Sequence, residues 1–375
     1  MSYRIAGIDV HKRILTVVIA DVQVAEDYQF EGRLYGSNPA SLQSLAEWLL
    51  EQEVQEVVME STAQYWKPVW GALERYWKPI CQERDGGVHP MSRALHLAQA
   101  QSNRARQGRK TDFTDAERLV KRLVANELTL SFVPDPEQRL WRTVTRAKYQ
   151  LTRNRVQLQN RLEALLEQAH IKLSSLVSDL LGASARRMLQ ALADGASDPT
   201  ALAALADHRL RATPEQLRDA LSACRDLSPL YRRLVKMALQ QLNLIESQIA
   251  QLDQEMADLL RSHQDQVQRL AEVPGLGADS AQQIIAEVGA TAATFPSSRQ
   301  FSSWVGACPG DNESAGVSRG HRSPKGNRHM RRLLNQAANA GVKYKGSIFQ
   351  ILYRRYAPRL GHNQTIGVVA HRLAA

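Results

Sequence analysis

The chain has 375 residues, of which 43% are hydrophobic and 23% are charged. This length allows two or three domains. No apolar run reaches the roughly 20 residues that a transmembrane helix needs, and Met1–Ile8 lacks the pattern of a signal peptide, so we expect a cytoplasmic protein. The formal net charge of +10 excludes a strongly acidic protein and favours a polyanionic partner such as a nucleic acid. The three cysteines are widely separated and form no CxxC pair, which argues against a disulfide framework.

Residues 1–130 alternate between strand-like and helix-like patterns. Short apolar segments rich in β-branched residues predict strands over Tyr3–Asp9, Ile14–Ala20, Tyr28–Tyr35 and Val54–Glu60, with a further short strand at Pro79–Gln82. Helical spacing predicts helices over Asn38–Glu53 (with Ser41 as N-cap), Trp66–Trp77, Pro90–Ala100 and Thr114–Asn126. A three-strand meander followed by alternating helices and strands predicts an α/β domain with a mixed sheet covered by helices.

Residues 131–264 are predicted to be long helices around a small insert. Gln138–Leu173 is helical and polar, and from Val235 to Leu259 apolar residues recur three and four apart for more than three heptads. This seam predicts a coiled coil. An internal antiparallel hairpin and an oligomerisation arm explain the seam equally well. Ser174–Ser228, between the two segments, is expected to be a small helical insert to which we assign no chemistry.

Residues 265–375 are predicted to be mainly α-helical. Leu270–Gly289 has the pattern of a helix-hairpin-helix, in which the turn Pro274–Gly277 would direct backbone N–H groups to a phosphate. An ordinary corner between two helices is the alternative. The segment is followed by basic residues, which favours contact with a DNA backbone.

A dense basic run covers Arg319–Arg332, with six Lys or Arg residues, two His and no acidic residue. Such a run without counter-charges is typical of a phosphate-binding surface, although many charge runs are only solvated faces. A second basic cluster follows at Tyr353–Arg359. The candidate nucleic-acid-binding residues are Lys110, Arg319, Arg322, Lys325, Arg328 and Arg331.

Four carboxylates stand at the ends of predicted elements. Asp9 and Glu60 end strands, and Asp112 and Asp115 lie three apart at the start of a helix, where they share a face. Carboxylates that converge repel one another unless a cation lies between them, and Mg²⁺ prefers oxygen ligands. Each acid alone could be a turn, surface or helix-end residue, but together they predict a metal site for phosphodiester chemistry.

Several motifs make the chain resemble the DEDD transposases of bacterial insertion sequences, whose relatives include the Piv-type DNA invertases. They are Gly7–Lys12 (GIDVHK), Glu60-Ser-Thr with Tyr65, Lys110–Ala116 (KTDFTDA), Val273–Gly277 (VPGLG), Phe301–Gly306 (FSSWVG), Asn312–Gly316 (NESAG) and Ser323–Asn327 (SPKGN) followed by Arg331-Arg332. Each motif is short, and their common order and spacing make the resemblance specific over nearly the whole chain.

The resemblance implies a RuvC-like, ribonuclease-H-type catalytic domain at 1–130, a coiled-coil domain at 131–264 and a transposase domain at 265–375. It implies that Asp9, Glu60, Asp112 and Asp115 bind Mg²⁺ or Mn²⁺. It also implies that Ser314 is a nucleophile that forms a covalent phosphoserine. The partners would be donor and target DNA, a structured guide RNA and further copies of the chain, as a dimer that assembles into a tetramer, in a bacterial cytoplasm and at the nucleoid when DNA is bound.

The chain departs from the family at two positions. Ala63 stands where the family often has Gly, and Ala315 separates Ser314 from Gly316, where many members have Ser-Gly. Ser318 and Ser323 are therefore further candidates for the nucleophile. A metal-dependent nuclease or Holliday-junction resolvase that uses water is the main alternative function, because the same carboxylates would serve it. A non-catalytic nucleic-acid adaptor is a second alternative, but it predicts that a carboxylate is missing, and none is.

Overall fold

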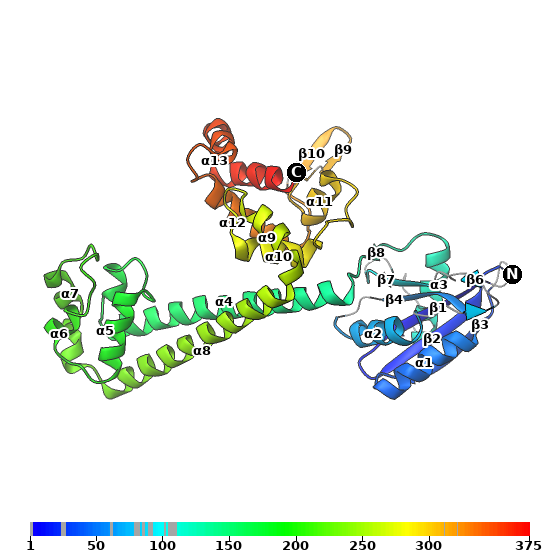
Figure 1. Cartoon of the computed structure of the whole chain (residues 1–375), viewed down its shortest axis with the longest axis horizontal. Helices are drawn as coiled ribbons and strands as arrows, with labels where there is room; N and C mark the ends of the chain where they lie inside the picture. Colours follow the sequence, from blue (N-terminus) through cyan, green and yellow to red (C-terminus); the bar gives the residue numbers. More distant parts are fainter. Residues whose placement is uncertain are drawn as a thin grey trace. The chain divides into compact units, whose positions relative to one another are not determined.

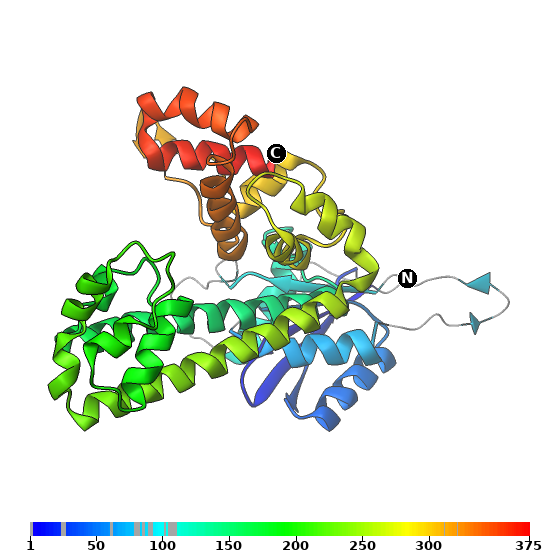
Figure 2. The same cartoon turned by 60° about the vertical axis from the view of Figure 1, so that its left-hand side comes forward.

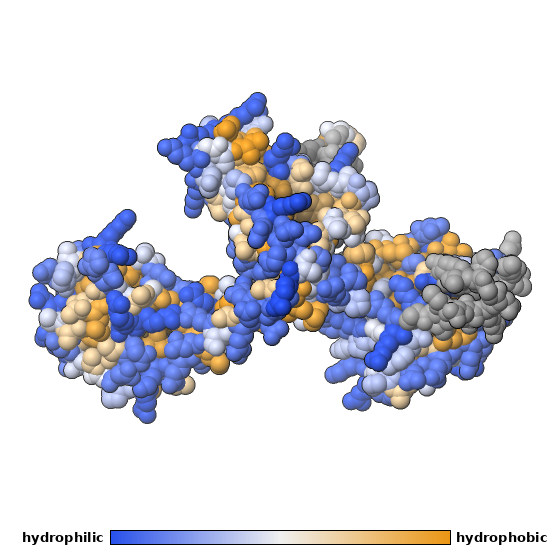
Figure 3. Space-filling view, viewed as in Figure 1, coloured by the Kyte–Doolittle hydropathy of each residue, from blue (hydrophilic) through white to orange (hydrophobic). Residues whose placement is uncertain are grey.

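A computed structural model describes residues 3–23, 28–60, 63–78, 83–84, 87–88, 93–100, 103, 111–310, 312–320 and 322–375. The chain divides into two compact units, Met1–Pro134 and Asp135–Ala375, which are described separately. The visible surface of each unit is mainly hydrophilic and carries smaller apolar areas (Figure 3). No helix in the described parts of the chain combines the length and the hydropathy that a bilayer span requires.

The first unit contains a six-stranded mixed sheet in the order β3-β2-β1-β4-β7-β8. β1, β2 and β3 form an antiparallel meander, β1, β4 and β7 run parallel to one another, and β8 is antiparallel to β7. Their bounds are Arg4–Val10 (β1), Ile14–Asp21 (β2), Phe30–Gly36 (β3), Val54–Glu60 (β4), Ala94–Ala98 (β7) and Leu130–Ser131 (β8), and β5 (Glu83–Arg84) pairs with β6 (Gly87–Val88) as a separate short ribbon. The mixed sheet is consistent with the predicted RuvC-like fold.

Helices cover both faces of this sheet (Figure 1). α1 (Pro39–Glu51) and α2 (Trp66–Tyr76) pack on one face through a core that includes Ile8 and Met59. α3 (Asp112–Val124) packs on the other face against Ile5 and Val58. Neighbouring strand residues therefore belong to opposite faces, as the twofold alternation of a β-strand requires.

The structure corrects two predictions in this unit. The helix predicted over Pro90–Ala100 is wrong, because Ala94–Ala98 forms strand β7, paired in parallel with β4. Its Ala and Leu residues favour a helix locally, and the ladder with β4 overrides that preference. The N-cap of α1 is Asn38 rather than Ser41, since the Asn38 side chain accepts a hydrogen bond from the Ser41 N–H. The strand predicted at Pro79–Gln82 lies outside the described residues.

The second unit begins with a long helical hairpin, hereafter the arm, made of α4 (Pro136–Gln168) and α8 (Pro229–Leu259). The two helices lie side by side in both views and run antiparallel (Figures 1 and 2), since Arg155 pairs with Glu246 and Lys148 with Asp253. The predicted seam on α8 is buried or half-buried at all of its positions, which are Val235, Ala238, Leu242, Ile245, Ile249, Leu252, Met256 and Leu259. The internal hairpin accounts for this seam, and an oligomerisation role stays a prediction.

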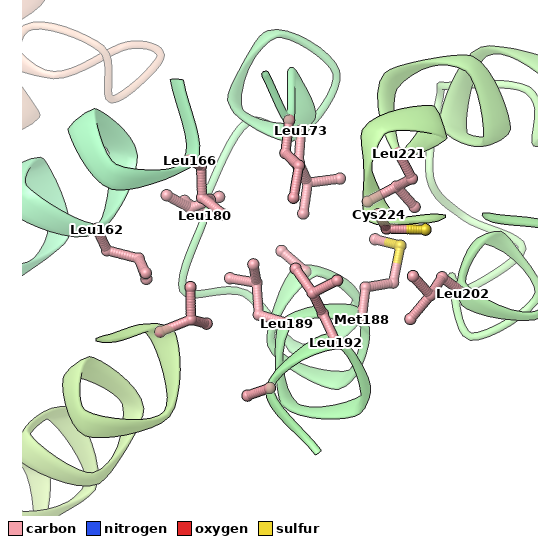
Figure 4. Close-up of a cluster of buried hydrophobic side chains, with 14 of the residues drawn as sticks. Leu162, Leu166, Leu173, Leu180, Met188, Leu189, Leu192, Leu202, Leu221 and Cys224 are labelled. Carbon is pink, nitrogen blue, oxygen red and sulfur yellow. The ribbon is translucent and has the colours of Figure 1, made fainter. Parts of the chain in front are cut away.

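The predicted insert forms a small helical tip at the end of the arm. It contains α5 (Ala183–Ala193), α6 (Pro199–Ala203) and α7 (Pro214–Ala220), with single 3₁₀ turns at Leu173–Ser175 and Ser222–Asp226. Its core joins residues of the tip to the adjoining ends of α4 and α8 (Figure 4). Met188 and Leu192 of α5 are fully buried there beside Cys224, so the tip is fixed to the end of the arm by a shared hydrophobic core.

The rest of the second unit is mainly helical, as predicted. It contains the 3₁₀ turn Arg261–His263, α9 (Gln264–Ala271), α10 (Ala278–Val288), α11 (Ser298–Val305), α12 (Arg328–Gly341), α13 (Ile348–Ala374, kinked at Gly361) and the hairpin strands β9 (Asn312–Ser314) and β10 (Val317–Gly320). α9 and α10 flank the predicted Pro274–Gly277 turn. A Cβ on Gly275 would lie 2.2 Å from the Ala337 carbonyl oxygen, so packing against α12 accounts for this glycine. The phosphate contact of this turn stays a prediction.

Candidate active site

Strand alternation brings two of the predicted carboxylates to the same face of the sheet. On β1, Ile5 packs against α3, so Asp9, four residues further, points to the α3 side. On β4, Val58 packs against α3, so Glu60 follows it to that side. The parallel ladder pairs Ile8 with Met59, which places Asp9 and Glu60 at neighbouring positions at the carboxyl end of the two strands.

Gly7 lets α3 approach β1 closely at this point. A Cβ at Gly7 would lie 2.3 Å from the carbonyl oxygen of Ala116 and 2.9 Å from a methyl group of Val120. No other residue fits without moving the helix. The glycine of the Gly7-Ile8-Asp9 sequence therefore allows the helix with Asp112 and Asp115 to lie against the strand that ends in Asp9.

The first turn of α3 carries the other two carboxylates. Thr111 caps the helix in a capping box with Thr114, which fixes where the helix starts. Asp115 is 7% exposed, whereas more than half of the Asp112 side chain is exposed. The N-terminal end of a helix favours negative charge, but this does not explain why Asp115 is buried at the sheet.

The electrostatics of Asp9 show that the four acids are close together. Burial raises the pKa of Asp9 above its ordinary value, and the charge of His11 opposes this effect. The negative charges of Asp115, Asp112 and Glu60 raise the pKa further. The structure thus brings together all four carboxylates that the sequence singled out, in an arrangement that favours a cation between them.

Three residues that the sequence did not single out complete this group. His11 Nε2 lies 3.2 Å from Asp9 Oδ2 and 3.5 Å from Asp112 Oδ1. Asn103, which is 4% exposed, donates a hydrogen bond of 2.8 Å to Glu60. Arg118 lies 2.8 Å from an Asp115 oxygen, one helical turn away. The i,i+3 spacing of Asp115 and Arg118 was a readable signal, whereas a lone Asn and a lone His give no pattern.

The predicted nucleophile lies in the second unit, at the tip of the β9–β10 hairpin. Ser314 is the last residue of β9 and pairs with Val317 across a loop of two residues, Ala315 and Gly316. Both loop residues have positive φ, +52° and +77°, as type I′ hairpin turns require. The extra residue Ala315 therefore belongs to the turn and leaves Ser314 on the strand.

Ala63 has a φ of +47°. Glycine adopts a positive φ at no steric cost, whereas an alanine is strained there. The backbone therefore favours glycine at this position, where the family that the chain resembles often has Gly.

The base of the β9–β10 hairpin is a neck in which the backbones of residues 305–310 and 322–326 touch. A Cβ on Gly310 would lie 1.9 Å from the Arg322 carbonyl oxygen, and a Cβ on Gly326 would lie 2.3 Å from the Val305 backbone. Arg331 ties the two segments together, because its Nη2 donates to the Gly306 carbonyl oxygen at 2.6 Å and to that of Pro324. Glycine is required at both contacts.

The candidate nucleic-acid-binding residues have different environments. Arg322, Lys325 and Arg328 are exposed, while Arg331 is half-buried and bonded to the neck carbonyls. Arg319 lies on β10, and Lys110 lies outside the described residues. Among the alternative serines, Ser318 lies on β10 and Ser323 is exposed in the loop that follows. The basic run is thus divided between a strand, a loop and the start of α12.

Comparisons with known proteins agree with this arrangement. Residues 6–171, which include the four carboxylates, match the family model of the IS110-type DEDD transposases, and residues 267–354, which include Ser314, match the "Transposase IS116/IS110/IS902 family". A "Probable family 20 transposase" of Pseudomonas aeruginosa is 28% identical over 239 residues. The match covers 63% of this chain and 60% of the relative, which is less than two thirds of that protein. Two separate segments of the chain are therefore similar to transposase families of the IS110/IS116 type.

Proposed function

We propose that this chain, two segments of which match IS110/IS116-type transposase family models, cuts and rejoins DNA strands as the transposase of a mobile element. The observation that supports this most is the convergence of Asp9, Glu60, Asp112 and Asp115 on one face of the sheet, reflected in the raised pKa of Asp9. A buried carboxylate near three others is unfavourable without a cation, so a purely structural role would favour a neutral residue at position 9.

The donor set of this site fits a divalent cation. Carboxylate oxygens are the ligands that Mg²⁺ and Mn²⁺ prefer, and Asp9, Glu60, Asp112 and Asp115 would hold the ion. A bound ion would supply charge stabilisation for a phosphodiester oxygen. Asn103 and Arg118 hold Glu60 and Asp115 in place through the contacts described above, so their role is to position the ligands.

Ser314 would be the nucleophile. Its hydroxyl oxygen would form a bond to the DNA phosphorus, the bond from phosphorus to one deoxyribose oxygen would break, and that oxygen would take up a proton while the serine proton passes to a base. The product is again a phosphodiester, so attack by a second strand can reverse the step without an energy source. The exposed Arg322 and Lys325 of the neck, and Arg328 just after it, would offset the phosphate charge.

The partners are part of the proposal. Donor and target DNA would bind the exposed basic residues, and the same surface suits the structured RNA that the resemblance implies. A second copy of the chain would pack on the arm, where α8 carries an exposed apolar stripe outside the seam. This stripe consists of Leu230, Leu234, Met237 and Leu244, of which each is between 37% and 59% exposed. Their spacing of four, three and seven places them on one side of the helix.

A denaturing gel tests the nucleophile. The full chain is incubated with Mg²⁺, labelled junction DNA and the RNA transcribed from the element, and the wild type is compared with Ser314→Ala. Ser318→Ala and Ser323→Ala serve as matched controls in the same segment. We expect a protein-linked DNA band that only Ser314→Ala removes. Free cleaved ends of equal amount in all four proteins would instead establish the water-using nuclease or resolvase.

A further inference from the structure

His11 faces the carboxylate site although burial does not hold its ring in that direction. Half of the His11 side chain is exposed, at 52%, and its Nε2 is nevertheless within 3.5 Å of both Asp9 and Asp112. The His11 N–H donates to the Ile14 carbonyl oxygen at 3.1 Å, which fixes the backbone in the β1–β2 turn. One ligand atom from each of Asp9, His11 and Asp112 lies within 4.8 Å of the other two.

These separations match those of ligands that share one metal ion. Mg²⁺ holds oxygen ligands at about 2.1 Å in an octahedron, so neighbouring ligands are about 3 Å apart and opposite ligands about 4.2 Å apart. The distances from His11 Nε2 to the two carboxylate oxygens, 3.2 and 3.5 Å, are close to the spacing of neighbouring ligands. The three side chains can therefore surround an ion after small side-chain rotations.

A salt bridge alone explains this arrangement less well. A His that only neutralises a carboxylate needs one partner. His96 on β7 is an example, because its Nε2 lies 2.7 Å from Glu56 Oε2. His11 lies between two carboxylates that come from different elements, β1 and the start of α3.

We infer that His11 is a ligand of the same divalent cation as Asp9 and Asp112, so that the site contains a nitrogen donor and binds Mn²⁺ more tightly than Mg²⁺. The inference rests on the metal site of the proposed function and adds a ligand to it. Imidazole is a common ligand of transition metals, whereas Mg²⁺ selects oxygen. The neutral ring would use the Nε2 lone pair, and the carboxylates would supply the negative charge.

Pulsed electron paramagnetic resonance on the full-length protein with Mn²⁺ tests this ligand directly. Coordination by His11 produces ¹⁴N modulation of the Mn²⁺ electron spin echo, and ¹⁵N-labelled histidine changes its frequencies. The variants are His11→Ala and His11→Asn, with His96→Ala as the matched control. Calorimetric titrations with Mn²⁺ and Mg²⁺, and circular dichroism of each variant, accompany the spectra. Asp115→Asn shows the effect of losing a carboxylate.

We expect ¹⁴N modulation in the wild type and in His96→Ala and none in either His11 variant. Loss of His11 should weaken Mn²⁺ binding by about tenfold or more, because mutation of residues around a metal typically has at least this effect on its affinity. Mg²⁺ binding should weaken by a smaller factor. Mn²⁺ binding without ¹⁴N modulation in the wild type would overturn the role of His11 and leave the carboxylate site of the proposed function intact. Absence of any Mn²⁺ or Mg²⁺ binding would overturn both.

Discussion

Arg146 of α4 binds Glu287 of α10 through two guanidinium nitrogens, Nε at 2.9 Å and Nη2 at 3.0 Å. Glu287 is only 2% exposed, and its carboxylate also accepts a 2.8 Å hydrogen bond from Asn327. Asn327 is the N-cap of α12 and ends the loop that leaves the hairpin neck. One buried carboxylate therefore connects the arm to the segment that follows Ser314.

We expect Glu287→Gln to lower the free energy of unfolding by about 3 kcal/mol at pH 7, because it leaves the arginine charge without its buried partner. Burial alone would raise the pKa of Glu287, but Arg146, Asn327 and Arg142 lower it below its usual 4.5. A lowered pKa means that the contribution is present above pH 4.5 and disappears as the pH falls through the folded-state value. The difference between variant and wild type in urea titrations should therefore shrink below pH 4.5.

Glu246→Gln is the control for this experiment. Glu246 also accepts two hydrogen bonds from one arginine, Arg186, but its side chain is 30% exposed. Water screens such a pair, so the loss should be about 1 kcal/mol or less. Equal losses in the two variants would contradict a special role for the buried carboxylate.

Gly7→Ala should separate α3 from β1 and weaken metal binding. The added methyl group would overlap the Ala116 carbonyl group, and overpacking of this kind typically costs about 1–3 kcal/mol. We expect a lower midpoint of thermal unfolding and a weaker Mn²⁺ affinity by calorimetry. Gly71→Ala in α2 is the control, because a Cβ there meets no atom within 4 Å, and alanine favours a helix. Unchanged Mn²⁺ binding in Gly7→Ala would contradict the dependence of the site on this contact.

Ala315→Asn should stabilise the hairpin that carries Ser314. An L-residue such as Ala is strained by about 1–2 kcal/mol in the left-handed region, whereas Asn tolerates it and Asn-Gly is a preferred type I′ turn. A gain of about 1 kcal/mol corresponds to about fivefold slower amide exchange, measured by hydrogen–deuterium exchange of the peptide 310–320. Ala315→Val should have the opposite effect, and faster exchange in Ala315→Asn would contradict the assigned turn.

The basic residues should divide into those that contact DNA and one, Arg331, that stabilises the neck. Replacing the exposed Arg322 and Arg328 by Ala should make the negative slope of log K against log salt for DNA binding shallower by about 2. Each phosphate contact that is lost reduces the number of counterions released on binding by about one. Arg331→Ala should instead speed amide exchange in the neck, because its guanidinium holds the carbonyl groups of Gly306 and Pro324. An unchanged salt slope in the double variant would show that DNA binds elsewhere.

The apolar stripe on α8 should decide the oligomeric state. Leu234→Glu with Met237→Glu places two charges on the exposed stripe, so we expect the mass measured by light scattering to fall to that of a smaller assembly. Ile351→Glu is the control, because Ile351 is at least as exposed as Leu234 and Met237 but lies on α13 rather than on an arm helix. An unchanged mass would exclude this stripe as the contact between copies.

The carboxylate site was predictable because its signals are local. Asp9 and Glu60 end strands with clear β-branched patterns, and Asp112 and Asp115 share a helix face whatever the rest of the fold is. β7 was not predictable in the same way, because Ala94–Ala98 favours a helix and becomes a strand only through its ladder with β4. Asn103 and the contact of His11 with Asp112 join the site through distances between elements, which a single sequence does not encode in any spacing, whereas the i,i+3 spacing of Arg118 from Asp115 on α3 could be read.

The glycine contacts at Gly310 and Gly326 also make the β9–β10 hairpin modular. Backbone contacts define its base and a turn of two residues defines its tip. The strands β9 and β10 connect these two fixed ends. Because these neck contacts include no residue of β9 or β10, we expect that strands of other lengths would fit above the same neck. A change of register there would carry Ser314 further from the neck or closer to it.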